Sequence, residues 1–483
     1  MDDAKGTAAG VAVITSAAEP DGAPRLAGLD ILRGIAILCI LFMNINDMGA
    51  SFANFGMAVR NLGWTPADRA AWFLREVLAD GTARCLLEML FGVGMVILTD
   101  RAAGALGQAA VRPSGRLART VRWLFGPWAV MRAYYWRNFV LFMFGVAHLS
   151  LLMWPGDILH TYGVAAMVAF LFRRLGPKTL LGFGLILAVV QLGAAGFFLQ
   201  RAQTSIARIA DIRAGHHAPA SAADRKMIAA LNRTLHARAL GRAQQARRIA
   251  ADDRDQSAAT GSAARWFAAA WRNDAFFYLG IGEGASIIEW GSIWEAAGTM
   301  LIGAALFRWG VIQGRRSRRF YLVLLLASYA IGLGGRTGRA LEEMRFVDYP
   351  SLWYATTELT RVATTLGHIC LAWLLLGTAA GARLLRPFAA AGRTALSLYV
   401  GQTLICLWLL FPPFALGLYG KLGWMSLMLT AAAINLALLA LANWWVERFS
   451  IAPVEWAWRS IVAGRRLPFR HRHPHSVGAP RLA

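Results

Sequence analysis

The sequence has little charge for its length. Of its 483 residues, 16% are charged and 57% are hydrophobic, whereas a soluble chain has about 25% charged residues. This excludes an ordinary soluble enzyme. The apolar residues gather into blocks of roughly 18 to 25 residues, the length that an α-helix needs to cross ~30 Å of hydrocarbon. The sequence therefore predicts an all-α polytopic membrane protein.

Cysteine is also scarce, and its spacing does not match that of disulfide or zinc-binding motifs. The four cysteines lie inside apolar blocks without CxxC or His-paired spacing, namely Cys39, Cys85, Cys370 and Cys406. This excludes a disulfide framework and a zinc site, and we expect no metal.

Lysine is nearly absent, although the formal net charge is +23. The chain has four lysines against 46 arginines, and most arginines stand in short runs between apolar blocks. Such runs orient helices in a bilayer, because cytoplasmic loops carry the excess of positive charge. The charge is therefore a topology signal and does not indicate a nucleic-acid partner.

Uninterrupted apolar windows predict about ten transmembrane helices. The windows are 29–49, 83–100, 136–153, 157–173, 179–199, 290–308, 319–335, 361–382, 388–410 and 424–446. Arginine-rich connections alternate with balanced or acidic ones along this series, which places both termini in the cytoplasm. We expect a bacterial cytoplasmic (inner) membrane protein with the lipid bilayer as its first partner.

The chain divides into five segments. We expect a disordered tail at 1–28, which lacks a basic stretch followed by an apolar core and is therefore no cleaved signal. Helices 1–5 follow at 29–200, an Ala-rich extracytoplasmic insert at 201–285, helices 6–10 at 286–447 and a basic cytoplasmic tail at 448–483. The insert is expected to be a helical hairpin packed on the outer face, or alternatively a lid or the docking site of a protein partner.

Ionisable groups inside membrane helices are expensive, so each needs a reason. Asp30 and Arg33 stand three residues apart on one helix face at the cytoplasmic end. They could neutralise each other and let the helix start below the interface, or they could bind an anionic ligand. Glu88 and Glu295 stand alone on their helices, so an interhelical contact is expected more than a proton relay.

The densest polar cluster is a helical hairpin around Trp154-Pro155-Gly156. His148 precedes this tight turn, and Asp157, His160 and Tyr162 follow it. A histidine within reach of a carboxylate is what general-base chemistry needs. We therefore name His148, Asp157 and His160 as catalytic candidates, although a lone buried histidine is often only a packing residue. Further polar candidates for substrate binding are Asn44, Asn46, Tyr162, His368 and Gln402.

Five blocks in order resemble the YeiB-type family of bacterial membrane proteins. They are residues 25–46, 90–94, the His148/Gly156–Leu159 hairpin, 392–399 and 453–459. This family is grouped with transmembrane acyltransferases related to heparan-α-glucosaminide N-acetyltransferase. The resemblance implies an enzyme that moves an acyl group from cytoplasmic acyl-CoA to an unknown extracytoplasmic acceptor. Residues 26–147 contain no histidine, so the base expected near helix 1 in the relatives would have to be His148 here.

Acyl-CoA as donor would require cations on the cytoplasmic side, because it carries phosphates. The candidates for this donor site are Asp30, Arg33, Arg132, Arg137 and Arg393. Positive-inside orientation explains the same arginines equally well. Two other functions remain open, a transporter or flippase of an anionic or amphipathic molecule and a non-catalytic membrane subunit.

Overall fold

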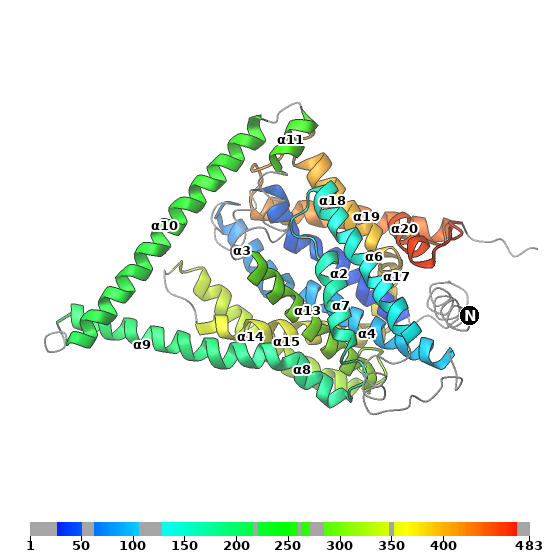
Figure 1. The fold of residues 1–483 in the computed structure, drawn as a ribbon, viewed down its shortest axis with the longest axis horizontal. Helices are drawn as coiled ribbons and strands as arrows, with labels where there is room; N and C mark the ends of the chain where they lie inside the picture. Colours follow the sequence, from blue (N-terminus) through cyan, green and yellow to red (C-terminus); the bar gives the residue numbers. More distant parts are fainter. Residues whose placement is uncertain are drawn as a thin grey trace, which may run out of the picture.

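The computed structural model describes residues 27–50, 62–105, 128–215, 221–258, 262–270, 285–346 and 352–470. In these ranges the chain is helical. The described residues contain an isolated β-bridge between Phe449 and Arg470 but no β-strand. This agrees with the predicted all-α class. Figure 1 shows a compact bundle from which two long helices project.

The first half begins with α2 (Ala27–Gly49) and α3 (Pro66–Leu74), followed by the π-helical turn η3 (Arg75–Ala79) and α4 (Thr82–Ala105). Thr65 caps α3 in a reciprocal capping box with Asp68, which fixes where the helix begins. The hairpin follows as α6 (Trp128–Leu152) and α7 (Leu159–Phe170), and then come α8 (Pro177–Val190) and η5 (Gln191–Ala195).

The second half begins with α13 (Ala285–Arg308) and α14 (Arg318–Glu343). The 3₁₀ turn η7 (Leu352–Thr356), α15 (Thr357–Leu376), α16 (Ala379–Leu385), α17 (Pro387–Arg393), α18 (Ala395–Leu404) and η8 (Ile405–Leu410) follow. The described chain ends with α19 (Trp424–Arg448) and α20 (Pro453–Ala463). The C-terminal segment 448–470 thus contains a helix, and this helix packs against α6 and α18.

Six helices in the described ranges are long and apolar enough to cross a membrane, or seven if one bent pair counts as a crossing. They are Ala27–Gly49, Pro66–Ala102, Pro177–Arg213, Arg318–Glu343, Trp353–Leu376 and Trp424–Arg448. The chain is therefore a helical membrane protein by length and composition.

The window 388–410 was expected to form one helix, but the structure bends it. Helices on either side of Thr394 meet at 80°, and Thr394 itself leaves helical geometry at φ −114° and ψ 21°. The bend follows from close packing: a Cβ added at Gly392 would lie 1.8 Å from the backbone oxygen of Asp30, and one at Gly34 would lie 2.0 Å from that of Phe388. Helices α2 and α17 therefore cross with their backbones in contact.

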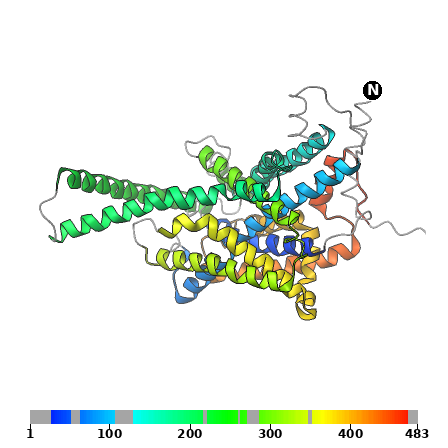
Figure 2. The same ribbon diagram turned by 90° about the horizontal axis from the view of Figure 1, so that it is seen from below.

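The insert forms α9 (Gly196–Arg213), α10 (Ala222–Ala258) and α11 (Ala263–Ala270). Helix α9 continues the line of α8, and α9 and α10 project away from the bundle instead of lying on it (Figures 1 and 2). Arg208 and Asp224 join the two arms at 2.7 Å. The hydrogen bond from Arg208 holds the pKa of Asp224 below its ordinary value, so this contact is intact at neutral pH and weakens in acid.

The chain returns to the bundle at α11. The buried Trp266 ring contacts Trp408 and Phe414, with centroid distances of 5.4 and 5.6 Å. Aromatic contacts of this kind stabilise a fold by more than the buried apolar area alone would give. The projecting hairpin is thus fixed to the bundle at both of its ends.

Candidate functional site

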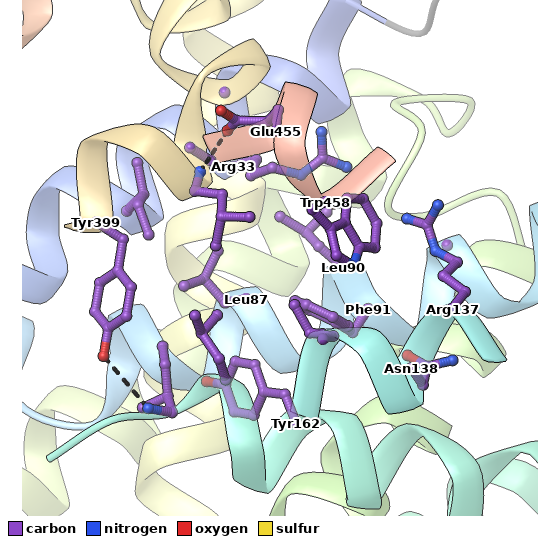
Figure 3. Close-up of a pocket in the computed structure, with 18 of the residues that line it drawn as sticks. Arg33, Leu87, Leu90, Phe91, Arg137, Asn138, Tyr162, Tyr399, Glu455 and Trp458 are labelled. Atoms are coloured by element: carbon purple, nitrogen blue, oxygen red, sulfur yellow. Dashed lines mark hydrogen bonds between the residues drawn. The ribbon is translucent and has the colours of Figure 1, made fainter. Parts of the chain in front are cut away.

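A cavity of about 270 Å³ lies between six parts of the bundle. It is lined by residues of α2, α4, α6 and α7, of the α17–α18 bend and of α20 (Figure 3). Of the residues that the sequence singles out, Arg33, Arg137, Tyr162 and Arg393 line it. Its position at the bend follows from the α2–α17 crossing, which holds Arg33 and Arg393 on neighbouring backbones.

One side of the cavity is cationic. Arg33, Arg137, Arg393 and Arg459 line it, and Arg33 pairs with Asp30 at 2.9 Å. The Arg137 guanidinium lies over the Trp458 ring at 4.2 Å from its centroid. Guanidinium groups bind phosphate in a bidentate manner, so this side can hold a phosphorylated ligand.

Glu455 of α20 faces the same cavity and caps α18. Its carboxylate accepts hydrogen bonds from the Leu396 N–H at 2.6 Å and the Ser397 N–H at 3.2 Å, and the Ser397 hydroxyl donates to it. Burial raises the pKa of Glu455, although the Ser397 hydrogen bonds act in the opposite direction. The N-terminal end of α18, where the helix dipole is positive, is therefore already capped by Glu455.

Trp458, one turn beyond Glu455, brings an unused donor to the cavity. Its side chain is 8% exposed and lines the cavity, yet its indole Nε1–H has no hydrogen-bond partner. An unpaired buried donor costs free energy of about 1–3 kcal/mol, so a ligand that accepts a hydrogen bond here would relieve that cost. Sequence reasoning did not identify Glu455 or Trp458, because both lie in the segment assigned to the basic tail.

The α6–α7 hairpin brings His148, Asp157 and His160 together. His148 Nδ1 lies 2.8 Å from Asp157 Oδ1, and His160 Nδ1 lies 2.9 Å from Asp157 Oδ2. The His160 backbone N–H also donates to Oδ2, at 3.0 Å. Gly145 permits this approach, since a Cβ there would lie 2.2 Å from the His160 nitrogen. One buried carboxylate thus orients two imidazole rings.

The second nitrogen of His148 faces a hydroxyl group. Its Nε2 lies 3.0 Å from Oγ1 of Thr403 on α18. An ionised Asp157 can only accept hydrogen bonds, so His148 carries its proton on Nδ1 and Nε2 has the basic lone pair. Asp157, His148 and Thr403 are therefore arranged as carboxylate, base and hydroxyl. Thr403 has no sequence signal, because it comes from a helix 255 residues away.

Tyr399 stands between the cavity and this triad. It lines the cavity, and its hydroxyl accepts from the Ile158 N–H at 3.3 Å and donates to Asp157 Oδ1 at 3.4 Å. His148, Asp157 and Thr403 themselves are buried and do not line the cavity. The cavity and the triad are thus separated by one side chain.

The other sequence candidates lie elsewhere. Gln402 donates to the Ile37 carbonyl and to Asn435, and His368 bonds Tyr329 and the Leu78 carbonyl. Asn46 donates to Asp47 at 2.7 Å. Arg132 is exposed on α6, and Asn44 is partly buried in α2. None of these five lines the cavity.

A second buried cluster contains the interhelical contacts that were expected for Glu88 and Glu295. Glu88 and Glu295, which appeared alone in the sequence, both contact Arg361, at 3.0 and 3.1 Å. Arg361 also contacts Glu358 at 2.8 Å and the Thr299 hydroxyl at 3.0 Å. Arg84 bonds Glu295 and accepts at its carbonyl from the Tyr162 hydroxyl. Arg361 is the first residue of the predicted window 361–382, and it is 3% exposed inside the bundle.

No group of three or more His, Cys, Asp or Glu side chains arranged to hold a metal ion occurs in the described parts of the chain.

The helices and the cavity define a polytopic helical membrane protein. A family of proteins of unknown function, DUF418, matches residues 306–465. The uncharacterized protein YeiB of Escherichia coli is 27% identical over 449 residues, covering 90% of this chain and 95% of the relative. The uncharacterized protein YxaH of Bacillus subtilis is 25% identical over 460 residues, covering 91% and 94%. The chain is therefore similar to YeiB-type bacterial membrane proteins along most of its length. No solved structure matches it.

The buried cluster generates a stability prediction. Arg361→Gln leaves Glu88, Glu295 and Glu358 without their shared cation, and breaking a buried ion pair costs about 3–5 kcal/mol. We expect a clearly lower melting temperature in detergent. Adding Glu88→Gln should recover part of the loss, because one unpaired carboxylate is removed. Arg132→Gln, at an exposed site, is the control. An unchanged melting temperature in Arg361→Gln would contradict this role.

Proposed function

We propose that this protein is an integral membrane acyltransferase that takes an acyl group from cytoplasmic acyl-CoA and passes it to a hydroxyl or amine at the membrane or its outer face. The observation that carries the proposal is a cavity with arginines on one side and, behind Tyr399, a buried carboxylate–histidine–hydroxyl arrangement. The resemblance to transmembrane acyltransferases supports the same reaction class.

The donor binds with its phosphates toward the arginines. At about 270 Å³ the cavity lies just under the range of 300–1,000 Å³ typical of ligand pockets, so it cannot hold the whole donor, and the adenosine stays outside. The Trp458 Nε1–H is available to a carbonyl or amide oxygen of the ligand. Asp30 has a supporting role, since it orients Arg33.

The chemical step uses His148 as base. The acceptor hydroxyl or amine takes the position of Thr403 Oγ1 at His148 Nε2, gives its proton to that nitrogen and attacks the thioester carbon. The carbon–sulfur bond breaks, and the CoA thiolate takes the proton back from the imidazolium. Asp157 holds the ring and stabilises its positive charge, as carboxylates do beside a catalytic histidine. His160 shares the same carboxylate and orients it.

The proposed topology has ten crossings, both termini in the cytoplasm and the projecting hairpin outside, in the bacterial inner membrane. It adds crossings to the six or seven helices that are apolar enough by composition. The added crossings are α6, α13 and the shorter α7. Helices α6 and α13 have 25 and 24 residues, and at 1.5 Å per residue each exceeds ~30 Å of hydrocarbon. Arg137 and Asn138 of α6 line the cavity, and Glu295 and Thr299 of α13 contact Arg361.

Thiol labelling tests the topology. In a chain whose four native cysteines are replaced by alanine, we expect an impermeant maleimide added to intact cells to label Thr234→Cys on α10. It should not label Ser317→Cys, between α13 and α14, until the membrane is permeabilised. The reverse pattern would move the hairpin to the cytoplasm and refute the proposed orientation.

Donor binding is tested on two arginines of one helix. Arg137 lines the cavity, whereas Arg132 is exposed outside it. A charge-assisted contact to phosphate contributes about 1.5–3 kcal/mol, so Arg137→Gln should weaken CoA binding about ten- to a hundredfold. Arg132→Gln should leave it unchanged. The measurement is a CoA titration of purified protein, and wild-type protein without CoA affinity would refute the donor.

The base is tested by turnover. His148→Gln should lower acyl transfer about 10²- to 10⁴-fold, since that is the usual contribution of general-base catalysis. Because the side chain is buried, melting temperature and CoA affinity are measured on the same sample. A variant that folds, binds CoA and transfers at the wild-type rate would eliminate His148 as the base.

A transporter of an anionic amphipath is the second candidate function. The α17–α18 pair favours it, because transporters often bind substrates where a membrane helix is broken. The two functions predict different results. A transporter would move an amphipath across the membrane of proteoliposomes without cleaving a thioester, so no acyl transfer would be measured with either the wild type or His148→Gln.

A further inference from the structure

One face of α4 forms an apolar wall of the cavity. Six of its residues line it, with helical spacing that puts them on a single face: Leu87, Leu90, Phe91, Gly94, Met95 and Leu98. At 1.5 Å per residue the stripe from Leu87 to Leu98 is about 16 Å long. Leu141 of α6 and Ile37 of α2 also line the cavity. A ligand that touches this wall gains by burying aliphatic surface.

Gly94 is the position in this stripe without a side chain. A Cβ added there would meet nothing within 4 Å. Gly92, two residues earlier on the same helix, is different: a Cβ there would lie 1.8 Å from the Met300 backbone oxygen, so α4 and α13 need that glycine to pack. Helix packing therefore explains why a glycine stands at position 92 but does not explain the glycine at position 94. A helix-interior glycine is less stable than alanine, and here it leaves open space inside the cavity.

The open space adjoins the cationic side. Arg33, Arg137, Arg393 and Arg459 belong to the same cavity as the α4 wall. A ligand that satisfies both needs an anionic head and an aliphatic chain. Acetyl-CoA has the head but almost no chain, so it would leave the wall uncovered.

We infer that the space over Gly94 is a slot for the aliphatic chain of an acyl-CoA longer than acetyl-CoA, and that Gly94 sets how long a chain it takes. This inference rests on the proposed function, because it assigns the chain of that same donor. Each methylene that enters the slot should tighten binding by up to about fourfold, the usual effect of burying one CH₂ group.

The test is a chain-length series with a filled slot. Protein in nanodiscs is titrated with CoA, acetyl-CoA, hexanoyl-CoA and decanoyl-CoA below their micelle concentrations. For the wild type we expect affinity to rise from acetyl to hexanoyl or decanoyl. In Gly94→Leu the affinity for the long-chain compounds, relative to acetyl-CoA, should be at least tenfold lower than in the wild type. The affinity of this variant for CoA and acetyl-CoA should stay within about threefold of the wild-type values. Gly94→Ala should fall between the two.

The matched control is Gly182→Leu. Gly182 is also a helical glycine with nothing within 4 Å of its Cβ, but it lies on the exposed surface of α8, away from the cavity. It should keep the wild-type chain dependence. Neither leucine variant should fall below the wild-type melting temperature, since an added Cβ meets nothing within 4 Å at either position and leucine is a better helix former than glycine.

The outcomes separate this inference from the proposed function. CoA binding with no dependence on chain length, or a dependence that Gly94→Leu leaves intact, overturns the slot but not the donor. Absence of binding by every CoA compound overturns the donor itself. Lysophosphatidate with the same chains is titrated in parallel, and if it alone binds with a Gly94-dependent affinity, the slot belongs to a phospholipid and the assignment to acyl-CoA is wrong.

Discussion

The bundle depends on one buried guanidinium. Arg361 of α15 contacts Glu88 of α4, Glu295 of α13 and Glu358 of its own helix. An unpaired charge in this environment is far more costly than a paired one, so α4, α13 and α15 cannot slide past one another without losing the pairing. Helix α4 also supplies the apolar wall of the cavity, in which Leu87 is the neighbour of Glu88. The Tyr162 hydroxyl, bonded to the Arg84 carbonyl, connects the α6–α7 hairpin to the same cluster. The ion cluster therefore fixes the cavity wall although it does not line it.

The opposite side of the cavity is fixed by backbone contact. Gly34 and Gly392 allow α2 and α17 to cross with no side chain between them, and any larger residue would have to push two backbones apart. This crossing places Arg33 and Arg393 together and turns the chain at Thr394, so that α18 begins at the cavity. Glu455 then caps α18. A close helix crossing, a bend and a helix cap thus produce one cationic pocket. Arginines that the positive-inside rule explains from the sequence also line this pocket.

The sequence predicted what local patterns encode and missed what distant residues create. Apolar windows predicted an all-helical membrane protein, and the short Trp-Pro-Gly turn predicted that His148 and Asp157 would meet, because a tight turn forces its two helices together. Thr403 could not be predicted as the partner of His148, since nothing local links α6 to α18. Arg361 resembles a loop charge until α4 and α13 pack on it. The 80° bend was missed because its cause, the contact of Gly392 with Asp30, is tertiary.

The separation between cavity and triad gives Tyr399 a particular place in the proposed reaction. Donor and base lie on opposite sides of its ring, so an acyl group reaches His148 only if this side chain moves. Its two hydrogen bonds, at 3.3 and 3.4 Å, are long, whereas the contacts of His148 with Asp157 and Thr403 are 2.8 and 3.0 Å. Hydrogen bonds weaken as they lengthen beyond their usual range, so these two contacts hold the tyrosine hydroxyl less firmly than Asp157 and Thr403 hold the histidine. In the proposed reaction, a movement of Tyr399 would join the cavity to the buried triad while Asp157 keeps the base oriented.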